Sequence, residues 1–230
     1  MTLITSIAPY TECRQKTPTR PCAWARRSTV RRCGKLQRQA GSKHDHPILP
    51  QAATLTWEGL RNLPIPQEVR QGCVFNEIEL SRKGIDELPA PLNRATCWIY
   101  CREAWPHSDP DFEGDIFITL AVQADHRYCQ LVPGNKHTEI PVFPGLLFTT
   151  DPLSLHWLAP NSDDGAGFIG LQFEVPYHSA DEFFSALTAE LSSLGQIRVE
   201  RPALNDALLV ATGEYVGTPP GPLAEMENCA

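Results

Sequence analysis

The chain has 230 residues, enough for one sizeable domain with its own core, and 42% of them are hydrophobic, as in ordinary globular proteins. No apolar run approaches the roughly 20 residues that a membrane-spanning helix needs, so no membrane partner is expected. The net charge of −7 conceals an asymmetry, because residues 1–50 carry a net +8 and residues 51–230 a net −15. An acidic body gives no support for nucleic-acid binding, which depends on Lys and Arg at the phosphates.

Residues 1–51 are predicted to be a basic, disordered arm outside the folded domain. They are rich in Arg, Thr, Pro, Gln and Ser and show no sustained apolar period. Three interpretations stay open: an organelle transit peptide, an arm that binds nucleic acid, or a stretch upstream of the true start of the protein.

The eight cysteines contain no C-x-x-C pair. The nearest two, Cys97 and Cys101, lie in a strand-like run, where their offset places the side chains about 13 Å apart, too far for a disulfide. Buried free thiols in a reducing compartment are therefore expected, and a cytoplasmic location is the prediction, with the transit peptide as its alternative.

Residues 52–216 show the pattern of one β-rich domain, followed by a loose tail at 217–230. Asp115–Gln123 is the clearest strand, because Ile116, Ile118, Leu120 and Val122 alternate along it. Further β segments are predicted at 73–80, 95–105, 127–132, 137–143, 146–150, 153–158 and 167–175, and helical segments at 57–63, 81–88, 179–194 and 202–216. Many short strands with Pro/Gly turns predict a mainly β (α+β) sandwich or barrel with flanking helices.

Motifs of the common nucleotide-binding and hydrolase classes are absent from the sequence. It contains no G-x-G-x-x-G, no P-loop and no G-x-S-x-G, so dinucleotide, NTPase and ordinary serine-hydrolase functions lack support.

One constellation carries metal chemistry: His107-Ser108-Asp109, then Pro144-Gly145, then His156 on a later predicted strand. Two imidazoles and one carboxylate on one face of a divalent metal leave adjacent coordination positions open for other ligands. In an extended backbone, residues i and i+2 point to the same side, which suits a His-x-Asp pair at a strand end.

The order of these features resembles the 2-oxoglutarate- and Fe(II)-dependent oxygenases, a family with the double-stranded β-helix (jelly-roll, cupin-like) fold. The resemblance covers about residues 96–177. It implies that His107, Asp109 and His156 bind Fe(II), that 2-oxoglutarate is the cosubstrate, and that the reaction is a hydroxylation-type oxidation. No catalytic residue beyond the metal ligands is predicted.

The chain departs from this family at the residue that holds the far carboxylate of 2-oxoglutarate. The family usually places an Arg or Lys shortly after the distal His, but none occurs between His156 and Arg198. Some members supply the cation from the strand after His-x-Asp, and the resemblance then points to Arg127, with a hydrogen bond from Tyr128 or Thr119.

Two alternatives remain open from the sequence. A cupin needs a His-x-His, which occurs only at residues 44–46, so Glu103, His107, His126 and His156 form a poorly spaced cupin set. A non-catalytic jelly-roll binding module, or a degenerate oxygenase fold without metal, is the alternative from another class. The substrate, a small molecule or a protein, is not indicated.

Overall fold

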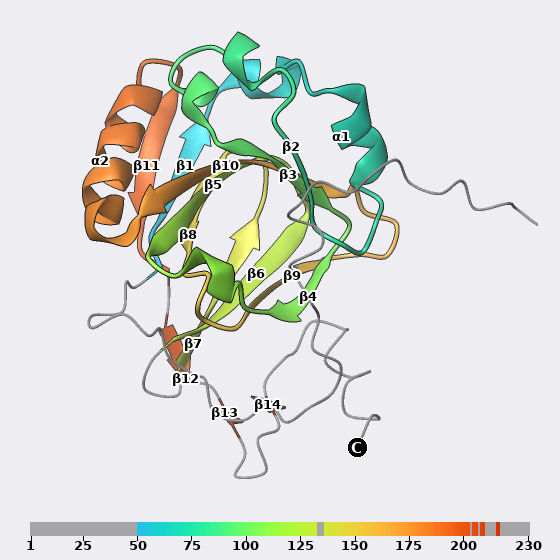
Figure 1. Cartoon of the computed structure of the whole chain (residues 1–230), viewed down its shortest axis with the longest axis vertical. Helices are drawn as coiled ribbons and strands as arrows, with labels where there is room; N and C mark the ends of the chain where they lie inside the picture. Colours follow the sequence, from blue (N-terminus) through green and yellow to red (C-terminus); the bar gives the residue numbers. More distant parts are fainter. Residues whose placement is uncertain (1–49, 133–135, 203, 207, 210–214, 217–230) are drawn as a thin grey trace, which may run out of the picture.

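The structure is a computed structural model that describes residues 50–132, 136–202, 204–206, 208–209 and 215–216. Its main elements are two antiparallel sheets with helices outside them (Figure 1). The larger sheet has seven strands in the order β11-β1-β8-β5-β10-β3-β2, and the smaller has five in the order β12-β7-β6-β9-β4. The described part of the chain is therefore mainly β, as predicted.

The larger sheet consists of β1 (Ala52–Thr56), β2 (Glu79–Ser81), β3 (Cys97–Cys101), β5 (Asp115–Gln123), β8 (Leu146–Thr150), β10 (Phe168–Pro176) and β11 (Gln196–Glu200). The smaller consists of β4 (Ala104–His107), β6 (His126–Val132), β7 (Lys136–Val142), β9 (His156–Pro160) and β12 (Leu204–Asp206). The short strands β13 (Leu208–Leu209) and β14 (Tyr215–Val216) pair with each other.

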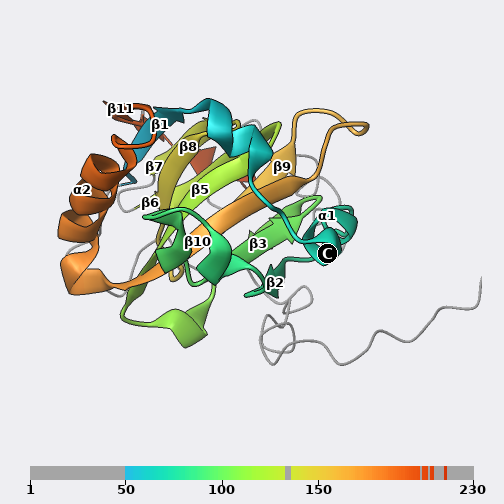
Figure 2. The ribbon, with the colours of Figure 1, turned by 90° about the horizontal axis from the view of Figure 1, so that it is seen from above.

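The helices are α1 (Gln67–Gly72) and α2 (Ala180–Leu191), with short 3-10 turns η1 (Glu58–Asn62), η2 (Ile85–Glu87), η3 (Leu92–Arg94), η4 (Pro110–Phe112) and η5 (Tyr177–Ser179). Seen from above, α2 lies at one end of the molecule and α1 at the other (Figure 2).

Consecutive strands from β3 to β10 move between the two sheets. β3, β5, β8 and β10 belong to the larger sheet, whereas β4, β6, β7 and β9 belong to the smaller one. Apart from the β6–β7 hairpin, each strand from β3 to β9 is therefore followed by one in the opposite sheet. This arrangement places the inner faces of the two sheets against each other.

Two apolar layers follow from this arrangement. One lies between the sheets, where Tyr128 of β6 packs on Phe148 of β8 with 4.9 Å between the ring centroids. The other lies between the outer face of the larger sheet and the helices, and there Phe173 contacts Phe183 of α2. A strand in the middle of the larger sheet is thus apolar on both faces.

β5 shows this double burial most clearly. Its bounds match the predicted strand Asp115–Gln123, and all residues from Ile116 to Val122 are buried. The alternating residues Ile116, Ile118, Leu120 and Val122 pack in the outer layer with the helices, whereas Ala121 belongs to the layer between the sheets. The predicted strand 146–150 and the helix predicted at 179–194 also appear, as β8 and α2.

Two predicted segments are wrong. The strand predicted at 73–80 is largely a turn that follows α1, and only its end belongs to β2. Val74 and Phe75, which suggested a strand, are exposed by 61% and 58%. The helix predicted at 202–216 is also wrong, because the described residues there form β12, β13 and β14, and β12 pairs with β7.

The predicted arm at 1–51 lies almost wholly outside the described residues, as does the predicted tail at 217–230; β1 begins at Ala52. Within the described part, no helix is long and apolar enough to cross a membrane. The four described cysteines, Cys73, Cys97, Cys101 and Cys129, are buried free thiols, as expected.

Candidate metal centre

Two adjacent strands of the smaller sheet bring the predicted histidines together. In the β4–β9 pair, Ala104 lies opposite Leu158 and His107 opposite His156, so β4 contains one residue more than β9 over this interval. Such a β-bulge re-aims side chains and often lies beside active sites. Here it makes His107 and His156 direct cross-strand neighbours, with 4.4 Å between their ring centroids.

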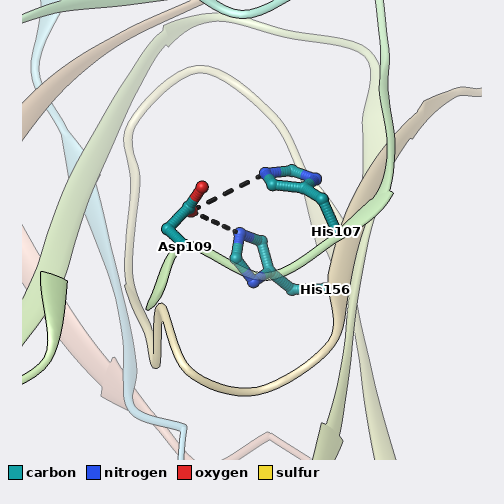
Figure 3. A group of neighbouring side chains, drawn as sticks. All are labelled: His107, Asp109 and His156. Carbon is teal, nitrogen blue, oxygen red and sulfur yellow. Dashed lines mark ion pairs between the residues drawn. The ribbon is translucent and has the colours of Figure 1, made fainter. Parts of the chain in front are cut away.

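Asp109 reaches the same point from the loop that follows β4. It precedes the 3-10 turn η4, and its backbone N–H donates to the carbonyl oxygen of Pro152 at 2.6 Å. This bond ties the His-x-Asp loop to the turn that leads into β9. The carboxylate of Asp109 faces the rings of His107 and His156 (Figure 3).

The three side chains have the spacing of a metal site. Asp109 Oδ2 lies 3.7 Å from His107 Nε2 and 3.5 Å from His156 Nε2, and the three ligand atoms all lie within 4.8 Å of one another. A point about 2.4 Å from each atom exists in such a triangle, close to the roughly 2.0–2.2 Å of metal–nitrogen and metal–oxygen bonds. Small side-chain rotations complete the approach.

Both imidazoles are oriented for a metal by hydrogen bonds at Nδ1. His107 Nδ1 lies 2.5 Å from the carbonyl oxygen of Trp105, and His156 Nδ1 lies 2.9 Å from that of Ser154. A carbonyl oxygen accepts from Nδ1–H, which leaves the Nε2 lone pair for a metal, the usual arrangement of metal-ligating histidines. His107 Nε2 is moreover a buried nitrogen without a hydrogen-bond partner. The donor set therefore fits a divalent cation.

The electrostatics of the metal-free centre are dominated by burial and by the ion pair between Asp109 and His156. Burial, together with the charge of His156, lowers the pKa of His107 to about 4. Burial alone would lower the pKa of His156, but the hydrogen bond and charge of Asp109 outweigh it and raise that pKa. Burial likewise opposes the ionisation of Asp109, yet its contacts with His156 hold its pKa below the usual value. A metal would displace the proton from His156.

Sequence reasoning missed the turn that supports the ligands. The Asp151 carboxylate accepts hydrogen bonds from the Leu153 N–H and the Ser154 hydroxyl, both at 2.9 Å. This closes the turn whose carbonyl oxygens, on Pro152 and Ser154, receive Asp109 N–H and the His156 ring. The Asp-x-x-Ser pattern before the distal His is a sequence signal from which such a turn could have been predicted.

A buried polar network continues from this turn into the space between the sheets. Gln130 Oε1 accepts from the Asp151 N–H at 3.1 Å and from the Tyr128 hydroxyl at 2.6 Å. Burial raises the pKa of Tyr128 far above its ordinary value, so the phenol stays protonated. The Tyr128 ring lies 6.3 Å from that of His156.

Of the three residues predicted to bind the cosubstrate, two face the layer between the sheets and one does not. Tyr128 is buried between the sheets, and Thr119 also faces inward because Ile118 and Leu120 on either side of it belong to the outer layer. Arg127, next to Tyr128, points to the opposite face of the smaller sheet, where its guanidinium lies 3.6 Å from Glu139. This placement does not support Arg127 as a partner of a cosubstrate carboxylate.

The cupin ligand set is not assembled. His126 is fully buried, and its Nε2 lies 2.7 Å from the Arg102 carbonyl oxygen while its Nδ1 accepts from the Asp125 N–H. Among the described residues, the one group with the spacing of a metal site consists of His107, Asp109 and His156.

Comparison with known proteins gives no match: no protein family, no curated protein and no solved structure is significantly similar to this chain. The function must therefore be argued from the geometry of the centre.

Proposed function

We propose that the chain is a non-haem Fe(II)-dependent dioxygenase with a double-stranded β-helix (jelly-roll) fold and a 2-oxo acid cosubstrate, of which 2-oxoglutarate is the usual one. The observation that carries the proposal is the convergence of His107, Asp109 and His156, with both histidines anchored through Nδ1. A facial set of two histidines and one carboxylate is typical of Fe(II) oxygenases. The four buried free thiols are compatible with a cytoplasmic location.

The fold assignment has support in the strand order. The order β8-β5-β10-β3 in the larger sheet and β7-β6-β9-β4 in the smaller one is that of eight strands wound alternately through two facing sheets. His107 ends the second of these strands, Asp109 follows it, and His156 begins the seventh. The resemblance likewise implies a His-x-Asp after one strand and a distal histidine on a later strand.

The reaction balances with one cosubstrate and one substrate. A 2-oxo acid, O2 and a substrate C–H bond give a carboxylate shorter by one carbon, CO2 and a C–OH bond. The new carboxylate and the C–OH group each take one oxygen atom of O2, and both oxygen atoms of CO2 come from the carboxylate of the 2-oxo acid. Fe(II) supplies the binding and activation of O2. His107, Asp109 and His156 would hold the metal through two imidazoles and one carboxylate, a ligand set that would leave coordination positions open for the reactants.

Two of the three candidate ligands are already in the protonation state that binds a metal, whereas the raised pKa of His156 favours its protonated form. The lowered pKa of His107, to about 4, keeps its ring neutral at ordinary pH, and the lowered pKa of Asp109 keeps its carboxylate ionised. Both are the forms that bind a metal.

Metal binding tests the proposal directly. Anaerobic titration with Fe(II) should show about one ion per chain for the wild type, and His107→Ala, Asp109→Ala and His156→Ala should each weaken binding at least about 100-fold by removing one of three ligands. His178→Ala removes an exposed histidine on η5 and should leave binding unchanged. Addition of a 2-oxo acid to the Fe(II) form should then give a weak visible absorption band.

A second function is favoured by one observation. No Lys or Arg among the described residues is buried, so a dicarboxylate cosubstrate lacks an evident partner there. Under this alternative the chain is a non-catalytic jelly-roll binding module or a degenerate oxygenase fold. Negligible metal content that His156→Ala does not change, together with no visible band, would establish it against the dioxygenase.

A further inference from the structure

Cross-strand pairing aligns four residues of the smaller sheet with the metal centre. His107 pairs with His156, His156 with Gln130, and Gln130 with Thr138. All four lie in one line across β4, β9, β6 and β7, and we call them the metal row. Because strand residues alternate between faces, the residues two positions away form the neighbouring rows on the same face.

One neighbouring row leads into the layer between the sheets. Ala104 pairs with Leu158, Leu158 with Tyr128, and Tyr128 with Ile140. These four residues, which we call the inner row, are all buried between the sheets. The only polar group among their side chains is the Tyr128 hydroxyl.

The larger sheet faces the inner row with uncharged side chains. Gln172 of β10 pairs with Thr119 of β5, and Thr119 pairs with Phe148 of β8, whose ring contacts Tyr128 at 4.9 Å. Gln172 faces inward because its neighbours Leu171 and Phe173 belong to the outer layer. Gln172 and Thr119 are 4% and 3% exposed. The polar side chains on this side of the metal row are thus the amide of Gln172 and the hydroxyls of Thr119 and Tyr128.

A carboxylate already lies next to Gln172. Glu174 is two positions further along β10, on the same face, and its Oε1 lies 3.5 Å from Gln172 Nε2. Burial raises the pKa of Glu174, and the charge of Asp115 raises it further, while Gln172 and the more distant Arg82 lower it. The surroundings of Glu174 therefore disfavour negative charge, including that of a second carboxylate.

Arg82, whose charge acts on Glu174, is exposed, and two further arginines are engaged elsewhere. The guanidinium of Arg127 lies on the other face of the sheet beside Glu139. The guanidinium of Arg102 donates to the Asp163 carbonyl oxygen at 2.7 Å.

Lys136 lies on the opposite side of the metal row. It pairs with Val132, two positions beyond Gln130, whereas Tyr128 lies two positions before it. Lys136 also lies opposite Asp206 of β12. Lys136 therefore lies on the same face of the smaller sheet as the metal row, but on the side of that row away from Tyr128.

From these positions we infer that the cosubstrate is a 2-oxo acid whose far end is uncharged, and that Gln172, with Glu174 beside it, is the residue that selects it over 2-oxoglutarate. A buried carboxylate without a cation is costly, whereas an amide and hydroxyls accommodate a neutral end at little cost. This inference rests on the proposed function, because it assumes that a 2-oxo acid binds the metal.

Three 2-oxo acids with the same five-carbon chain test the inference in anaerobic titrations of the Fe(II) form: 2-oxoglutarate, its 5-methyl ester, and 2-oxopentanoate, which ends in a methyl group. The visible band reports binding of each. The ester or 2-oxopentanoate should bind at least 10-fold tighter than 2-oxoglutarate. Equal affinities, or tighter binding of 2-oxoglutarate, would overturn the inference. If none of the three acids produces a visible band, the 2-oxo acid dependence of the proposed function is refuted. Fe(II) binding is measured separately and is not affected by that result.

Variants then locate the selection. Gln172→Arg combined with Glu174→Gln places a cation on β10 and removes the acid that would pair with it, so the order of affinities should reverse in favour of 2-oxoglutarate. Lys136→Met should leave the order of the wild type unchanged; if instead Lys136→Met weakens 2-oxoglutarate selectively, that lysine holds the far carboxylate and the inference is wrong. Circular dichroism shows whether the double variant folds. If it does not, the three-ligand titration of the wild type still tests whether an uncharged far end is preferred.

Discussion

At the scale of single residues, the metal centre depends on backbone carbonyl groups as much as on its three ligands. His107 is oriented by the Trp105 carbonyl oxygen and His156 by that of Ser154. Asp109 is held through its N–H by the Pro152 carbonyl oxygen. Two of these three carbonyls belong to the turn that the Asp151 carboxylate closes, so Asp151 is a positioning residue for two ligands at once.

Asp151→Ala should weaken metal binding about 10–100-fold, because supporting residues of metal ligands typically contribute this much. The turn loses the acceptor for the Leu153 N–H and the Ser154 hydroxyl, so the carbonyl groups on Pro152 and Ser154 are no longer fixed. Asp151→Asn keeps an acceptor oxygen and should recover most of the affinity. Fe(II) titration of the three proteins provides the measurement.

A matched control separates this effect from the loss of a negative charge. Asp163→Ala removes an exposed carboxylate and should not change the affinity. If Asp151→Ala binds Fe(II) like the wild type while remaining folded, the turn does not position the ligands.

The sequence identified the three residues of the candidate metal centre but not the groups that position them. His-x-Asp and a later His are visible as a local spacing, because the strand period places residues i and i+2 on one side. Gln172 and Glu174 were not singled out, since their position depends on the pairing of β10 with β5 and β3, which no local pattern encodes. The sequence suggests Arg127 because it lies on the strand after His-x-Asp. Successive side chains of β6 point to opposite faces of the sheet, however, so Arg127 lies on the other face from Tyr128.

At the scale of elements, the Pro144-Gly145 turn joins three strands of the larger sheet. Gly145 leads into β8, its N–H donates to the Ala121 carbonyl oxygen at 2.8 Å, and its own carbonyl oxygen accepts from the Leu55 N–H at 2.8 Å. Its φ of 96° lies in the left-handed region that favours glycine. A side chain there would also fall against the Leu55 carbonyl oxygen.

Gly145→Ala should therefore destabilise the fold by more than the about 1–3 kcal/mol that strained backbone alone costs. Gly114 offers a matched control, because its φ of 101° is similar while nothing lies within 4 Å of an added Cβ. Gly114→Ala should show the backbone cost alone. Urea unfolding of both variants measures the difference, and equal losses of free energy would show that the contact with Leu55 is relieved at no cost.

The elements that the sequence predicted correctly are those with local signals. The alternation along β5 and the apolar face of α2, with Phe184, Leu187 and Leu191 buried, each appear within one segment. The prediction of a strand at 73–80 is wrong because Val74 and Phe75 are apolar residues of strand-forming types but lie exposed in a turn. The helix predicted at 202–216 fails because β12 is defined by its pairing with β7, a contact remote in sequence.

At the scale of the whole molecule, the metal centre lies outside the main source of stability. The largest apolar cluster packs the outer face of the larger sheet against the helices and contains none of the three ligands. All three ligands belong to the smaller sheet and its loops, and two of them lie on β4 and β9. β4 is an edge strand of that sheet, so a metal would fasten an edge to its neighbour.

The metal-free protein should consequently be folded and unfold cooperatively, with a Tm that rises when Fe(II), or Mn(II) as its redox-stable substitute, is added. At a free metal concentration 100 times the Kd, the expected stabilisation is about 2.7 kcal/mol if only the folded state binds. His156→Ala should lose this shift while keeping its cooperative transition, and His178→Ala should retain the shift. A metal-free protein without a cooperative transition would mean that the outer apolar layer does not suffice, and that the centre between β4 and β9 is structural as well as functional. An equal shift in the His156→Ala protein would instead place the bound metal elsewhere on the molecule.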